Sequence, residues 1–166
     1  MSTHGFDPNQ AENLIDVFAV KAVEHAKTYW GLLEKVPPRQ LKLLKLDDEI
    51  FDHVMSAFPE LGENEHKKLI KLDEDWLKSE EGKKRWRAFI NAYEKKVKDF
   101  NFGSLIRTNA REEYSETNTI FGACASMHIA RNRLGLNDAI HEAAKAEAEK
   151  EREKKERQGS KQNDTQ

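Results

Sequence analysis

The sequence predicts a mainly α fold: a single-domain orthogonal helical bundle with at most one short hairpin, followed by a charged C-terminal helix. Apolar residues recur at three- and four-residue spacing through several long segments, which is the helical period. Alternation with a period of two never persists, so a larger sheet is not expected. The length of 166 residues, 37% of them hydrophobic, suits one domain with one core.

Composition changes along the chain divide it into four segments. We expect a disordered N-terminus at residues 1–6, a helical domain at 7–138, a charged solvent-exposed helix at 139–158 and a disordered tail at 159–166. The last helix is predicted from a run made almost entirely of Ala, Glu, Lys and Arg. Opposite charges recur there at four-residue spacing, as in Glu151 with Lys155 and Glu153 with Arg157.

The first predicted helix covers residues 8–35 and forms most of the scaffold. Asp7 can cap it, Pro8 suits its first position, and Gln10 can complete a capping box. Pro37 and Pro38 end it. Its apolar stripe consists of Leu14, Ile15, Phe18, Ala19, Ala22, Val23, Ala26, Trp30 and Leu33.

A second helix is predicted to begin at the acidic run Asp47, Asp48, Glu49, because negative side chains favour a helix N-terminus. Its stripe is Ile50, Phe51, Val54, Met55 and Phe58, and Pro59 and Gly62 close it. Short helical pieces should follow up to residue 78, with Asp73 as a cap between them.

Ser79 is predicted to open a third strong helix, whose apolar positions are Trp86, Phe89, Ile90, Tyr93 and Val97. The stretch DFNFGSLIRTNA, residues 99–110, comes next. We expect Phe100 and Phe102 to anchor a chain reversal that Gly103 permits, and Leu105 and Ile106 to return to the core. Any hairpin should lie near residues 104–108.

A further helix is predicted between residues 117 and 135. Thr117 or Thr119 would cap it, its apolar residues would include Ile120, Phe121, Met127, Ile129 and Ala130, and Gly135 would end it.

Charge and cysteine content exclude several classes of protein. The net charge is −2 and the pI is near 6.3, so no overall basic field attracts a phosphate backbone and DNA is not an expected partner. The lone Cys124 cannot form an internal disulfide or a thiolate metal cage and fits a reducing compartment. Since no leader or membrane-length apolar run occurs, we expect a soluble cytoplasmic monomer.

No catalytic motif is complete, so neither an enzyme nor a metal or cofactor site is predicted. Asp73-Glu74-Asp75 matches the DxD pattern of glycosyltransferases, but its helical context favours a capped helix start. His141 begins a partial zinc-protease pattern in which Lys145 replaces the second histidine. No phosphate-binding loop and no G-x-S-x-G elbow are present.

The segment KKRWRAF, residues 83–89, has two interpretations. In the first, Trp86 faces the core of an amphipathic helix while the cations extend into solvent. In the second, the cations contact ribosomal RNA or an acidic protein surface locally.

Five long segments occur in one order over residues 18–138: FAVKAVEHAKTYWGLL, LKLLKLDDEIFDHVMSAFPE, RWRAFINAYEKKVKDFNFGSLIRTNA, YSETNTIF and IARNRLGLND. In these segments the chain resembles the polysaccharide biosynthesis domain-containing protein 1 family of small eukaryotic cytosolic proteins. The resemblance implies a mainly helical fold. It also implies a dedicated ATP-independent chaperone that meets nascent translation elongation factor 1A transiently at the ribosome, protects its GTP-binding domain and releases it on folding.

Within the resembling segments we expect the partner to be contacted by Asn101, Phe102, Arg107, Asn118, Arg131 and Asn132, with Asn101 and Arg107 at the surface. Compared with the family pattern, the segment between Phe121 and Ile129 is about one helical turn short. Two other functions stay open: a non-enzymatic adaptor for the ribosome or another protein, and a role in polysaccharide biosynthesis, as the family name suggests.

Overall fold

Helices account for most of the structure, a computed structural model that describes residues 8–98, 104–122 and 125–163. The helices are α1 (Pro8–Lys35), α2 (Asp47–Ala57), α3 (Lys67–Ile70), α4 (Glu74–Lys78), α5 (Glu80–Asn91), α6 (Ala125–Arg133) and α7 (Asp138–Asn163). Short 3₁₀ turns lie at Pro38–Gln40, Pro59–Gly62 and Asn64–His66, and two strands, β1 (Ser104–Arg107) and β2 (Thr119–Gly122), form an antiparallel pair. The prediction of a mainly helical fold with one small hairpin is confirmed.

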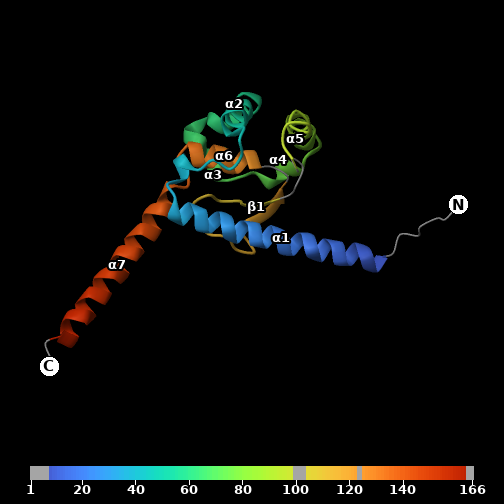
Figure 1. Cartoon of the computed structure of the whole chain (residues 1–166). Coiled ribbons are helices and arrows are strands. Elements are labelled where there is room, and N and C mark those ends of the chain that lie inside the picture. Colours follow the sequence, from blue (N-terminus) through green and yellow to red (C-terminus); the bar gives the residue numbers. More distant parts are fainter. Residues whose placement is uncertain (1–7, 99–103, 123–124, 164–166) are drawn as a thin grey trace.

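The hairpin lies between two helical layers (Figure 1). Helix α1 runs across one face of β1, and α6 packs on the other side, where it also contacts α2 and α3. Ile106 pairs with Ile120 in the strand register. Since side chains alternate across a sheet, Leu105, Arg107, Thr119 and Phe121 share the face toward α1.

The core fills the space between the hairpin, α2, α5 and α6. Phe58 stacks on Trp86, with ring centroids 4.2 Å apart, and Phe89 packs edge-on against both. Such aromatic pairs contribute about 0.5–1.5 kcal/mol beyond the area they bury. The other buried hydrophobic members are Ile50, Val54, Leu61, Leu69, Leu72, Tyr93, Ile106, Met127, Ile129 and Ala130.

Two predicted helix caps are confirmed. The Asp73 carboxylate accepts a hydrogen bond from the Trp76 amide at the start of α4, and the Ser79 hydroxyl accepts one from the Gly82 amide at the start of α5. Gly82 also lets the two helices meet closely, because a Cβ atom there would lie 2.1 Å from the carbonyl oxygen of Trp76.

The predicted helix at 117–135 is shorter than expected, which corrects its start. Residues Thr119–Gly122 form β2, and α6 begins only at Ala125. Pairing with β1 outweighs helix formation here, because Thr and Ile are β-branched and Ile120 is set opposite Ile106. The predicted end is confirmed: Gly135 has a φ of 74°, and Leu136 donates to the carbonyl of Arg131 in a Schellman motif.

Helix α7 projects away from the helical body (Figure 1). Its first turns contact α1, where a ring nitrogen of His141 lies 2.9 Å from the Glu34 carbonyl oxygen. The rest is exposed, as predicted, and carries the expected ion pair between Glu153 and Arg157. The helix continues to Asn163, whereas the sequence analysis expected it to end at residue 158.

Candidate functional site

Four of the six predicted partner-binding residues lie inside the protein. Arg107, Asn118, Arg131 and Asn132 are all buried, so they do not present a contact surface in this conformation. The expectation that Arg107 lies at the surface is wrong, since only 2% of it is exposed. Asn101 and Phe102, with Phe100 and Gly103, fall outside the described residues.

Arg107 is covered because α1 crosses the face of the hairpin from which it projects. Its guanidinium donates to the carbonyl oxygens of Ala110 at 2.7 Å and Glu112 at 3.1 Å and to the side-chain oxygen of Asn137. The cation also lies 5.2 Å from the centre of the Trp30 ring. Neutral oxygens and an aromatic face replace water around the charge.

Arg131 holds three segments together from α6. Its guanidinium donates to the carbonyl oxygens of Leu69 at 3.0 Å, Arg107 at 2.6 Å and Thr108 at 3.2 Å. Burial, with a contribution from the charge of Arg107, lowers the pKa of Arg131 to about 10. The side chain therefore stays charged at neutral pH, and within the described part of the chain no carboxylate pairs with either buried arginine.

The two buried asparagines complete this network. Asn118 donates to the carbonyls of Asn109 and Glu113 and so closes the loop between the strands. Asn132 accepts hydrogen bonds from the Tyr29 hydroxyl at 2.9 Å and from Asn137 at 2.8 Å, which ties α6 to α1. The four residues are therefore positioned to maintain the fold, since their bonds run between its elements.

An apolar groove with a volume of about 290 Å³ lies between β2 and the pair α4 and α5. One wall carries Ile120, Phe121 and Gly122 of β2, and the opposite wall carries Trp86 and Ile90 of α5. The floor and ends are formed by Leu72, Leu77, Ile106 and Met127. Helix α5 can supply this wall because its apolar positions recur at helical spacing.

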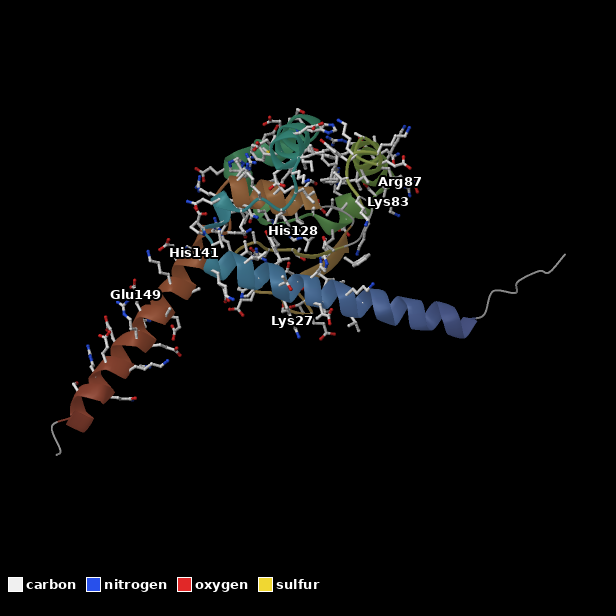
Figure 2. All side chains as sticks on the ribbon, viewed as in Figure 1. Lys27, Lys83, Arg87, His128, His141 and Glu149 are labelled. Carbon is white, nitrogen blue, oxygen red and sulfur yellow. The ribbon has the colours of Figure 1, made fainter. Side chains whose placement is uncertain are left out.

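Two cations without an ion pair among the described residues border the groove: Lys83 and Arg87 (Figure 2). They are four residues apart on α5 and therefore share one face of it. Lys78 also borders the groove but pairs with Glu74, and Arg85 pairs with Glu60. Trp86 is buried between the cations, which confirms the amphipathic interpretation of KKRWRAF.

Ile120 and Phe121 are groove residues that the sequence analysis placed wrongly. Both were assigned to the apolar stripe of a helix, but both lie on β2, where 65% of Phe121 is exposed. The run Thr119-Ile120-Phe121, which has β-branched and aromatic residues in sequence, is the signal that favoured a strand.

The remaining motifs do not assemble a metal site in the part of the chain that the structure describes. No three His, Cys, Asp or Glu side chains within that part are close enough together to hold an ion. Asp73 of the DxD pattern instead caps α4. Among the same residues, no helix has the length and apolar content required to span a membrane.

Known proteins match almost the whole described body. The family described as PBDC1 protein matches residues 14–142. A PBDC1 homolog of Saccharomyces cerevisiae is 47% identical over 146 residues, which cover 84% of this chain and 97% of the yeast protein. Human PBDC1 is 36% identical over 142 residues, covering 84% of this chain and 57% of the human protein.

A solved structure supports the same relationship. The solution NMR structure of a Saccharomyces cerevisiae protein superimposes with a TM-score of 0.73 at 43% identity, covering 85% of this chain and 96% of that one. Because sequence and fold agree over most of both chains, this chain belongs to the PBDC1 family, that of polysaccharide biosynthesis domain-containing protein 1.

Proposed function

We propose that the protein is a non-enzymatic, ATP-independent chaperone that binds the GTP-binding domain of nascent translation elongation factor 1A at the ribosome and releases it on folding. Two lines support the proposal. The family resemblance implies this client, and the apolar groove between β2 and α5 offers a surface suited to an unfolded segment. The groove is the structural observation on which the proposal rests.

The groove suits transient binding for a physical reason. Its lining is mostly aromatic and aliphatic, so it gains free energy by covering apolar side chains that an unfinished client exposes. Once the client folds, those side chains enter its own core. GTP stabilises the folded client and not the bound one, so linkage favours release without ATP. The protein would act in the cytoplasm, as a monomer, without metal or cofactor.

Ribosome-bound nascent chains provide the direct test. We expect the tagged protein, recovered from a translating extract, to carry ribosomes enriched in nascent elongation factor 1A. The variant Lys83→Glu with Arg87→Glu should reduce this enrichment, because it reverses the charge at the rim of the groove. Lys150→Glu with Lys154→Glu, on the exposed part of α7, makes the same change in net charge and is the matched control. Equal recovery of all nascent chains by the unmodified protein would refute the proposal.

A ribosome-binding adaptor is the second candidate, favoured by the exposed cations Lys83, Lys84 and Arg87. Contacts between these cations and ribosomal RNA would weaken steeply with salt. After puromycin removes nascent chains, an adaptor stays on ribosomes in low salt, whereas the proposed chaperone leaves them.

A further inference from the structure

The outer edge of β2 presents main-chain groups that point away from β1. Thr108 donates to the carbonyl of Asn118 at 3.0 Å, which places residues 108 and 118 in the hydrogen-bonded type of antiparallel pair. The pairs alternate in type along the ladder, so Ile106 with Ile120 is also hydrogen-bonded. The amides and carbonyls of Thr119 and Phe121 therefore face outward.

Contacts on β1 support this alternation. The carbonyl of Leu105 accepts a hydrogen bond from Tyr114, and that of Arg107 accepts one from Arg131, so both point away from β2. Within residues 8–98, 104–122 and 125–163, no hydrogen bond beyond the hairpin reaches the main-chain groups of Thr119 or Phe121. An unpaired strand edge of this kind is a template for another strand.

Hollows flank this edge on both faces of the hairpin. The apolar groove contacts Ile120 on the core side, and a second hollow of about 540 Å³ contacts Thr119 on the side of α1. The second hollow is lined by the apolar and aromatic residues Val23, Ala26, Trp30, Leu105 and Tyr114 and by the polar residues Lys27, Glu113, Ser115, Glu116 and Thr119. Side chains of an added strand would alternate between the apolar groove and this mixed apolar and polar hollow.

We propose that the outer edge of β2 pairs with an extended, unfolded polypeptide segment that has alternating apolar side chains and a carboxylate. Charge complementarity selects this occupant, since Lys83 and Arg87 border the groove without an ion pair in the described part of the chain. The inference rests on the proposed chaperone function and specifies how its groove binds a client. A folded client pairs its own strands internally, so it no longer offers the segment.

A defined peptide tests strand pairing directly. The probe is acetyl-Thr-Val-Thr-Val-Thr-Asp-amide, in which Asp lies on the same face of the strand as both Val side chains. It is titrated into the ¹⁵N-labelled full chain. We expect hydrogen exchange at the amides of Thr119 and Phe121 to slow at least fivefold on binding. The Ile120 amide, which faces β1, is the internal control. A peptide N-methylated at its four central residues cannot pair at either edge, so it should bind at least tenfold more weakly.

Two variants at residue 121 separate the contribution of its main-chain N–H to peptide binding from that of its side chain. Phe121→Pro removes the outward N–H, which an edge strand tolerates, whereas Phe121→Ala keeps it. We expect the proline variant to bind the peptide about fivefold to tenfold more weakly than the alanine variant, with both melting as single cooperative transitions. If the proline variant fails to melt cooperatively, the N-methylated peptide on the unmodified chain decides the question.

Three outcomes would overturn strand pairing. The first is equal binding of the plain and N-methylated peptides, and the second is unchanged exchange at Thr119 and Phe121 in the saturated complex. The third is binding of a ten-nucleotide polyuridine RNA at the groove without binding of the peptide. If nascent elongation factor 1A associates with the unmodified protein and equally with Phe121→Pro, this inference fails and the proposed function survives. If the peptide pairs with β2 but nascent elongation factor 1A is not enriched, the proposed function fails and this inference survives.

Discussion

Arg131 donates a hydrogen bond to the main-chain carbonyl of Arg107, 2.6 Å away, so one buried arginine holds the strand from which the other projects. Both guanidinium groups are surrounded by carbonyl, amide and aromatic groups. Two like charges in one interior repel each other and are costly to desolvate. They are stabilised by oxygens from α3, β1, the loop between the two strands and the Asn137 side chain.

Arg131→Met should destabilise the protein by about 3 kcal/mol or more, because three buried carbonyl oxygens lose a charged donor at once. Urea unfolding followed by circular dichroism measures the change. Arg87→Met is the matched control: it removes an exposed arginine from α5 and should alter stability by less than about 0.5 kcal/mol. Similar losses in both variants would contradict a structural role for Arg131.

His128 should make stability depend on pH. It lies in the interior of the helical body (Figure 2). Its ring packs against that of Tyr29, with ring centroids 4.5 Å apart. Burial, with the charges of Arg131 and Arg107, lowers its pKa from 6.5 to about 3. Between these values the unfolded chain binds a proton that the folded one does not, so stability falls as pH falls below 6.5.

The expected slope from His128 approaches about 1.4 kcal/mol per pH unit. Urea unfolding between pH 6.5 and 5 isolates it, because most carboxylates titrate below that interval. His128→Gln should flatten the slope even if it lowers stability at every pH. An unchanged slope in that variant would assign the pH dependence to other groups.

Gly82→Ala should destabilise the protein by about 1–3 kcal/mol, because its Cβ would collide with the Trp76 carbonyl where α4 meets α5. Gly31→Ala is the control. It lies in α1 with nothing within 4 Å of an added Cβ, so it should be neutral or stabilising by up to about 1 kcal/mol. Thermal unfolding of the two variants compares them, and equal melting temperatures would show that α4 and α5 are not packed this closely.

Substitutions at Asp73 distinguish a helix-capping role of its carboxylate from a metal-binding role. Its carboxylate accepts a hydrogen bond from the Trp76 amide at 3.1 Å. Asp73→Ala should therefore lower stability by about 1 kcal/mol, while Asp73→Asn, which retains a capping oxygen, should lower it less. Asp75→Ala should have little effect. Equilibrium unfolding with and without Mn²⁺ checks this. If Mn²⁺ stabilises the protein and either alanine substitution abolishes that stabilisation, Asp73-Glu74-Asp75 is a metal site of the glycosyltransferase type instead.

The local features of the fold were predictable from the sequence. Asp73 and Ser79 are helix caps and Gly135 is a helix end, because capping depends on a few neighbouring residues. The apolar stripe of α5 was predictable for the same reason. Phe121 was misassigned because the β-branched and aromatic run that favours a strand is only three residues long, and the strand forms by pairing with residues 104–107, some fifteen positions earlier.

The features of the candidate site also divide into those that the local sequence determines and those that depend on tertiary packing. The sequence by itself determined the cations and apolar residues of α5, since their spacing on a helix defines two faces. Only the tertiary structure decided that β2 forms the opposite wall of the groove and that α1 covers Arg107. Burial depends on which distant segments pack together. A charged residue such as Arg131 is therefore expected at the surface from its sequence context, although it is buried in the folded protein.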